Sequence, residues 1–109
     1  MPRPGDIVVV DFPGVQGVKR RPAVIVSSDE YHRTRPDVIV GLVTSQIPAA
    51  LGPSDYILTD WRSAGLNKPS TFRTFLVTLP RAAVSSTIGR PTAVDWSAIV
   101  RCVRGAMAS

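Results

Sequence analysis

The residues of this chain that could do chemistry are mainly arginines and hydroxyl-bearing side chains. Eleven of its 13 cationic residues are arginine, whose planar, permanently charged guanidinium matches a pair of phosphate oxygens. The single histidine, His32, excludes a two-histidine mechanism, and the single cysteine, Cys102, excludes an internal disulfide and a cysteine-based metal site. The sequence contains neither a glycine-rich phosphate loop nor a His-Glu metal helix. Any catalysis must therefore use arginine, threonine, serine, aspartate or the lone histidine.

The composition indicates a small, basic, globular protein. Its 109 residues fit one compact domain, which we assign to 1–109, and 44% of them are hydrophobic while 19% are charged. A net charge of +5 suits a nucleic acid, an acidic protein or a membrane surface, although a GC-rich genome would enrich arginine too. Since no apolar run reaches the length of a signal peptide or a membrane span, we expect a cytoplasmic protein without membrane association.

Short apolar segments rich in β-branched residues predict the elements that must position these side chains. Each segment is bounded by proline, glycine, serine or aspartate, as β-strands are. The five predicted strands are 7–12, 23–26, 38–43, 56–59 and 70–78. Together they predict a mainly β fold, either a small antiparallel barrel or a curled sheet.

The C-terminal segment changes to a helical period. Its apolar side chains recur at steps of three and four residues, which is the spacing of one helix face. They are Trp96, Ile99, Val100, Val103 and Met107. Thr92 as N-cap and Asp95 at the third helical position predict a capping box, and Gly105 is the predicted end. We expect this helix to cover the open side of the sheet, with partner binding as the alternative.

Two segments punctuated by glycine and proline are predicted to be surface loops. The first, 13–20, joins the first two strands, and the second, 46–54, follows the third strand. A basic triplet, Lys19-Arg20-Arg21, stands at the end of the first loop. The loops and this triplet are therefore candidates for contact with a ligand.

The histidine and the two tryptophans have competing interpretations. His32 is the only side chain with a near-neutral reference pKa, and we interpret it as a surface-loop residue rather than a general base. Trp96 lies on the helix stripe and is assigned to the core. Trp61, next to Arg62, is either a core residue or a platform for a stacked base.

Several sequence blocks make the chain similar to a known toxin family. They are Arg-Pro-Gly-Asp-Ile-Val at 3–8, Arg-Arg-Pro-Ala-Val-Ile-Val at 20–26, Val-Ile-Val-Gly-Leu-Val-Thr-Ser-Gln at 38–46, Ala-Gly-Leu at 64–66 followed by Ser70, and Ile-Gly at 88–89. Each block is weakly specific, but their order and spacing resemble the MazF/PemK toxins over nearly the whole chain. The resemblance implies a CcdB/MazF-like, Src-homology-3-like barrel and a homodimer. It also implies sequence-specific cleavage of single-stranded RNA without metal or cofactor, growth inhibition, and neutralisation by a cognate antitoxin.

The resemblance assigns roles to individual residues. It places the catalytic arginine at Arg21 and the catalytic threonine at Thr44. One branch of the family adds an arginine followed two residues later by an aspartate. Arg73 matches that arginine, but Phe75 stands where the aspartate would be. The candidate RNA contacts are Lys19, Arg20, Ser45, Gln46, Ser70 and Arg73.

The pair Arg21 and Thr44 suits cleavage of RNA by its own 2′-hydroxyl. The enzyme has to align that hydroxyl with the phosphorus and stabilise charge on the non-bridging oxygens. Arg21 can donate two hydrogen bonds to those oxygens and Thr44 one. Arginine has a reference pKa above about 12, so we assign Arg21 to charge stabilisation rather than to proton transfer.

Two other functions are compatible with the same fold. A CcdB-like toxin binds and poisons DNA gyrase without cleaving RNA, and a catalytically inactive barrel would serve only regulation or dimerisation. Arg21 and Thr44 favour the nuclease, whereas Phe75 in place of the carboxylate favours the inactive barrel.

Overall fold

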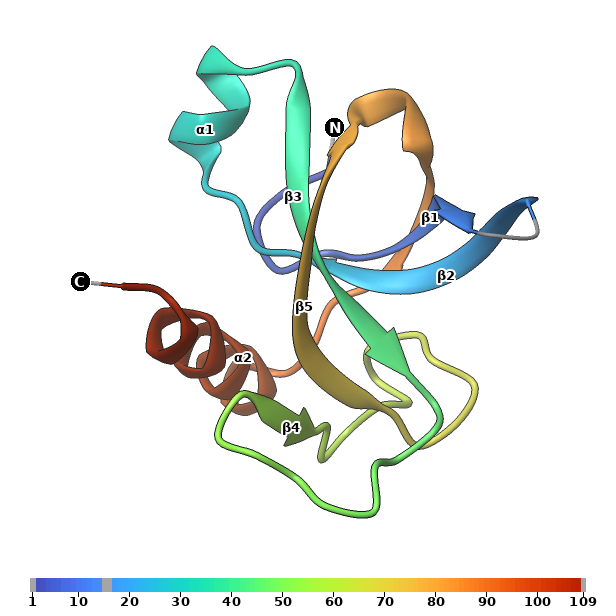
Figure 1. Cartoon of the computed structure of the whole chain (residues 1–109), viewed down its shortest axis with the longest axis vertical. Helices are drawn as coiled ribbons and strands as arrows, with labels where there is room; N and C mark the ends of the chain where they lie inside the picture. The colour runs from blue at the N-terminus through green and yellow to red at the C-terminus, as the bar shows by residue number, and fades with distance from the viewer. Residues whose placement is uncertain (1, 15–16, 109) are drawn as a thin grey trace.

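The computed structural model describes residues 2–14 and 17–108, and one antiparallel sheet of six strands forms its centre (Figure 1). The strands are β1 (Ile7–Gly14), β2 (Gly17–Ile25), β3 (Asp37–Thr44), β4 (Asp55–Ile57), β5 (Thr71–Pro80) and β6 (Val84–Gly89). Their order across the sheet is β4-β5-β3-β2-β1-β6. The predicted mainly β fold is confirmed. Among the described residues β4 and β6 remain edge strands, so the sheet is curled but not closed into a barrel.

The first two strands are longer than predicted. β1 and β2 continue their pairing as far as Gly14 and Gly17, with Asp11 opposite Arg20 and an ion pair of 3.4 Å between these two side chains. Most of the predicted 13–20 loop is therefore a strand hairpin that extends to one side of the molecule (Figure 1). The part of that prediction that concerns residues 15–16 lies outside the described residues.

One strand and one helix were not predicted. β6 is an edge strand whose central residues 85–87 are polar and exposed, so it lacks the apolar alternation that identifies a strand. Helix α1 (Asp29–Thr34) has six residues, too few for a helical period to show, and begins at the N-cap Ser28, whose hydroxyl accepts a hydrogen bond from the Tyr31 amide. A short 3-10 turn, η1 (Arg81–Ala83), joins β5 to β6.

The C-terminal helix matches its prediction closely. α2 (Ala93–Ala106) begins at Thr92, whose side chain accepts a hydrogen bond of 3.2 Å from the Asp95 amide, so the predicted N-cap is confirmed. The helix ends at Ala106, one residue after the predicted Gly105. No helix in the described ranges is long and apolar enough to cross a membrane.

The strand alternation divides the buried side chains between two cores, one on each face of the sheet. The first core lies beneath α2 and includes Ile7, Val24, Val43, Phe72 and Ile99. The second lies on the other face and includes Val8, Val10, Ala23, Val40 and Leu79. The helix therefore covers one face of the sheet, as predicted.

The tryptophans both belong to the first core. Trp96 and Trp61 pack against it while remaining partly exposed. The Arg62 guanidinium lies over the Trp61 ring, 4.9 Å from the ring centroid. Trp61 is thus a packed side chain covered by an arginine. Met107, the last residue of the predicted stripe, is 58% exposed and lies beyond the packed part of the helix.

A buried carboxylate joins α2 to the segment between β4 and β5. The Asp95 side chain is fully buried and accepts hydrogen bonds from the Tyr56 hydroxyl (2.5 Å), the Thr59 amide and hydroxyl (3.1 and 2.7 Å), and the Asp60 amide (3.0 Å). Burial alone would raise the pKa of Asp95, but these hydrogen bonds outweigh it and hold the pKa below its ordinary value. In the predicted capping box this carboxylate would bond to the N-cap amide; it binds residues 56–60 instead.

Candidate active site

The register of two central strands brings Arg21 and Thr44 to the same place. Ala23 of β2 lies opposite Leu42 of β3, and continuing this antiparallel register by two residues places Arg21 opposite Thr44. The hydrogen-bonded ladder ends at the Ala23–Leu42 pair. Beyond it, the two side chains line one cleft of about 450 Å³. Residues 23 positions apart in the chain thus face a shared space.

The cleft, called here the Arg21 cleft, is lined by basic and hydroxyl-bearing side chains. Its lining includes Arg20, Arg21, Thr44, Ser45, Gln46, Gly65, Leu66, Asn67, Lys68, Ser70 and Ile88. Arg21 is exposed, and no ion pair or hydrogen bond joins its side chain to the rest of residues 2–14 and 17–108. Three cationic side chains therefore surround an open space in which a phosphate would be electrostatically stabilised.

The orientation of Thr44 leaves its hydroxyl proton available. Thr44 is half-buried, and its Oγ1 accepts a hydrogen bond of 3.1 Å from the Gln46 amide. This bond uses an oxygen lone pair and fixes the hydroxyl without using its proton. The Thr44 hydroxyl can therefore donate a hydrogen bond into the cleft.

The other predicted RNA contacts lie in three different environments. Ser45 and Gln46 are exposed at the Arg21 cleft, and Arg20 lines it while paired with Asp11. Ser70 also lines the cleft, but it is buried and its hydroxyl donates to the Lys68 carbonyl at 2.8 Å. Ser70 thus holds the adjoining loop in place. Lys19 is exposed on β2, opposite Phe12, and is not part of the cleft lining.

Arg73 lies in a second cleft that adjoins the first. This cleft, called here the Arg73 cleft, has a volume of about 400 Å³ and shares Thr44 and Gln46 with the Arg21 cleft. Its other lining residues are Leu42, Ser54, Asp55, Arg73, Thr74 and Phe75. A ligand chain that crosses Thr44 could therefore occupy both clefts at once.

A carboxylate accompanies Arg73 although the residue two positions later is Phe75. Asp55 of β4 lies opposite Arg73 of β5, and the Arg73 Nε donates to the Asp55 Oδ1 at 3.1 Å. The hydrogen bond from the Gly52 amide and the Arg73 guanidinium lower the pKa of Asp55. Asp55 was not predicted as a site residue, because 18 residues separate it from Arg73. The strand β4 is only three residues long, so the sequence does not predict how it pairs with β5.

Two glycines, Gly65 in the lining of the Arg21 cleft and Gly89 behind it, bring two backbone segments into close contact. A Cβ at Gly65 would lie 2.1 Å from the Ile88 carbonyl oxygen, and a Cβ at Gly89 would lie 2.3 Å from the Ala64 carbonyl oxygen. Gly65 also has a φ of +85°, which side chains disfavour. The Ala-Gly-Leu and Ile-Gly blocks of the sequence therefore meet directly in space.

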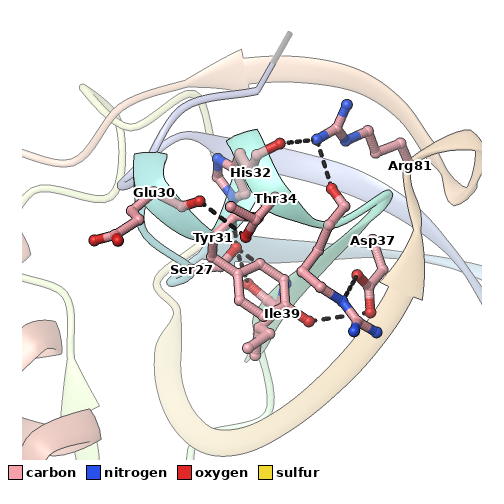
Figure 2. Close-up of polar contacts among 9 residues, drawn as sticks. Ser27, Glu30, Tyr31, His32, Thr34, Asp37, Ile39 and Arg81 are labelled. Atoms are coloured by element: carbon pink, nitrogen blue, oxygen red, sulfur yellow. Dashed lines mark hydrogen bonds and ion pairs between the residues drawn. The ribbon is translucent and has the colours of Figure 1, made fainter.

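The prediction that His32 lies in a surface loop was wrong. It is a buried residue of α1, 7% exposed, and lies outside both clefts. Its Nε2 lies 2.5 Å from the Ser27 Oγ, and the Arg81 Nη2 donates to its carbonyl oxygen (Figure 2). The polar neighbours in sequence suggested exposure, whereas the ring is buried and contacts Ser27, five residues earlier in the chain. His32 is a structural residue.

Lys68 and Asn67 are polar lining residues that the sequence did not single out as candidates. Both are exposed in the loop that precedes β5. The only sequence signal near them was the pair of blocks on either side, Ala-Gly-Leu at 64–66 and Ser70. Lys68 adds a third cation to the Arg21 cleft.

A comparison with protein families identifies one that covers almost the whole chain. The family described as "PemK-like, MazF-like toxin of type II toxin-antitoxin system" matches residues 3–107. No curated protein sequence matches the chain.

Solved structures with the same fold include an endoribonuclease and MazF toxins from bacteria. An endoribonuclease in complex with its cognate antitoxin, from a mycobacterial species, has a TM-score of 0.75, 17% identity and full coverage of both chains. A MazE–MazF structure from Deinococcus radiodurans has a TM-score of 0.75 and 18% identity, covering 95% of this chain and 94% of that one. The Mycobacterium tuberculosis toxin MazF-mt6 has a TM-score of 0.73 and 19% identity, with 92% and 93% covered.

Proposed function

Since the chain belongs to the family of PemK-like, MazF-like toxins of type II toxin–antitoxin systems, we propose that it is an endoribonuclease that cleaves single-stranded RNA. The observation that carries the proposal is the meeting of Arg21 and Thr44 in one open cleft. Both side chains have free donor groups there, and Arg20 and Lys68 add positive charge. This arrangement suits a phosphodiester in the cleft.

The reaction we propose needs no group beyond the RNA and the protein. The RNA 2′-oxygen attacks the adjacent phosphorus and loses its proton, while the bond from phosphorus to the 5′-oxygen breaks and that oxygen gains a proton. The products are a 2′,3′-cyclic phosphate and a 5′-hydroxyl. Arg21 would donate two hydrogen bonds to the non-bridging oxygens and Thr44 a third, stabilising the charge that develops there. DNA would survive because it lacks the 2′-hydroxyl.

The proposed partners follow from the same surface. The related mycobacterial endoribonuclease is in complex with its cognate antitoxin, and we propose an antitoxin for this chain as well. An acidic segment that orders on binding would compete with RNA for the Arg21 cleft. We further propose that the toxin acts in the cytoplasm as a homodimer and inhibits growth by cleaving mRNA at specific sequences.

The test of the function is an RNA cleavage assay in EDTA. Purified protein is incubated with a long mixed-sequence RNA, and the fragment ends are mapped for 2′,3′-cyclic phosphate and 5′-hydroxyl groups. Discrete fragments that disappear with Arg21→Ala and with Thr44→Ala support the proposal. Val94→Ala, on the exposed face of α2, is the control and should cleave as the wild type does. Intact RNA together with inhibition of DNA gyrase would contradict the nuclease and support the alternative, a toxin that poisons gyrase.

A further inference from the structure

Phe75 is an exposed aromatic residue at the edge of the Arg73 cleft. Its side chain lines the cleft and is 58% exposed. The alternation of β5 places it on the same face of the strand as Arg73. Phe12 of β1 packs against it in a T-shaped contact, with ring centroids 6.3 Å apart and planes at 77°. This contact orients the Phe75 ring while much of its surface stays open to solvent.

Arg73 is oriented beside that ring. Its Nε is bound to the Asp55 Oδ1 at 3.1 Å, and the Gly52 amide donates to the Asp55 Oδ2 at 2.9 Å. The Asp55 side chain is 13% exposed, whereas that of Arg73 is 49% exposed. Within the described ranges, no side chain other than Asp55 forms an ion pair with Arg73. Its terminal Nη groups therefore remain available as a planar pair of donors.

We propose that the Arg73 cleft binds one unpaired nucleobase of the RNA, which stacks on Phe75 and receives hydrogen bonds from Arg73. This inference rests on the proposed function, because Thr44 and Gln46 line both clefts and join the base site to the site of cleavage. Aromatic rings bind the faces of splayed-out bases in single-stranded RNA. Asp55 acts here as a positioning residue that holds the guanidinium.

The chemistry of Arg73 selects the class of base. A guanidinium offers two parallel donors and no acceptor, and guanine presents two adjacent acceptors, O6 and N7. The base that this cleft fits best is therefore guanine. Adenine presents a donor at the corresponding exocyclic position, opposite a donor of Arg73.

The test uses an RNA analogue that cannot be cleaved. A fluorescent heptamer of 2′-O-methyl nucleotides, six uridines with one central guanosine, is titrated with the protein, and anisotropy gives the affinity. Matched heptamers carry 7-deazaguanosine, which lacks the N7 acceptor, or adenosine at the centre. The wild type is expected to bind the guanosine heptamer most tightly.

Four variants separate stacking from hydrogen bonding. Phe75→Leu should weaken binding of the guanosine heptamer about tenfold, the scale of one lost base stack, while Phe75→Tyr keeps a ring and should restore it. Arg73→Lys and Asp55→Asn should lose the preference for guanosine over 7-deazaguanosine, a readout that a purely structural role of Asp55 would not change. Val94→Ala is the control, and thermal unfolding checks that each variant is folded.

Several outcomes would overturn the base site. Equal binding of guanosine and 7-deazaguanosine by the wild type would remove the role of Arg73. Unchanged affinity and unchanged cleavage positions in Phe75→Leu would remove the base site while leaving the proposed nuclease intact. A wild-type dimer that becomes monomeric in Phe75→Leu would assign this face to a second copy of the chain. Phe75-dependent binding by a protein that cleaves no RNA would overturn the nuclease and keep the base site.

Discussion

Arg21 and Arg81 are two arginines in opposite situations. The Arg81 Nη2 donates to the carbonyl oxygens of His32 and Arg35, the latter at 2.8 Å, and so connects η1 to the C-terminal end of α1 (Figure 2). Arg21 is exposed at its cleft and has no such partner in the part of the chain that the structure describes. A guanidinium bound to the protein adds stability, whereas an unbound one is available to a phosphate.

The same contrast holds for two hydroxyl groups. The Ser27 Oγ is buried, contacts the His32 ring at 2.5 Å and accepts a hydrogen bond of 3.1 Å from the Ile39 amide. The Thr44 hydroxyl accepts one hydrogen bond and keeps its proton free for the cleft. Residue type alone does not separate a structural polar group from a functional one. What separates them is the number of hydrogen bonds that the polar group already makes within the protein.

The largest effect is expected for Arg21→Gln. Losing a donor to the developing charge should lower cleavage about 100- to 1,000-fold. The free energy of unfolding should change by less than about 0.5 kcal/mol, because an exposed side chain without partners is removed. Single-turnover cleavage and urea unfolding measure the two quantities. A large loss of stability would show that Arg21 is bound within the protein after all.

The second effect is the loss of stability expected for Ser27→Ala. The substitution removes little volume but leaves the half-buried Ile39 amide and the buried His32 ring nitrogen without their partner, at a cost of about 2 kcal/mol. Cleavage per folded molecule should stay the same. Ser97→Ala on the exposed side of α2 is the matched control for urea unfolding. A tenfold fall in cleavage by folded Ser27→Ala would couple this cluster to the active site.

A smaller effect is expected for Arg81→Gln, the counterpart of Arg21→Gln. Two hydrogen bonds to carbonyl groups are lost, but the side chain is partly exposed, so water can bond to the freed carbonyl oxygens. We therefore expect the free energy of unfolding to fall by about 1 kcal/mol. Cleavage per folded molecule should not change. If the two glutamine variants behave alike in both assays, the distinction between bound and unbound arginines fails.

The smallest effect concerns pH. Burial tends to raise the pKa of Asp37, but the hydrogen bond from the Tyr31 hydroxyl and the nearby Arg35 lower it overall. A lowered pKa contributes stability above the unfolded-state value of about 3.9, and that contribution is lost as the pH falls through the folded-state value. Tyr31→Phe should therefore lose less stability than the wild type between about pH 5 and about pH 3, a range that spans the reference pKa of aspartate. If melting temperatures of the variant and the wild type fell by the same amount over this range, the role of Tyr31 in lowering the pKa of Asp37 would be contradicted.

The sequence was sufficient for the central strands and for the pairing of Arg21 with Thr44. Short β-branched apolar segments identified strands near those of the structure, and the family resemblance selected the two side chains that the strand register brings together. The same reasoning predicted Thr92 and the buried face of α2 because capping and helical period are local properties.

The remaining features depend on contacts that local pattern does not contain. Asp55 joins Arg73 only through pairing of a three-residue strand, and local pattern does not contain the contacts of His32 with Ser27 and Arg81. The polar strand β6 forms because β1 offers it an edge. Tertiary pairing decided all three, and a single sequence carries little information about it.

The backbone contact between Gly65 and Gly89 also constrains how this toxin can diversify. Beside the Arg21 cleft, main chain is pressed against main chain, so a larger residue at either position would push the two segments apart rather than reshape the cleft. In a saturation library we expect both positions to tolerate glycine alone. New binding preferences of the cleft would then have to arise from its exposed lining side chains, such as Gln46, Asn67 and Lys68.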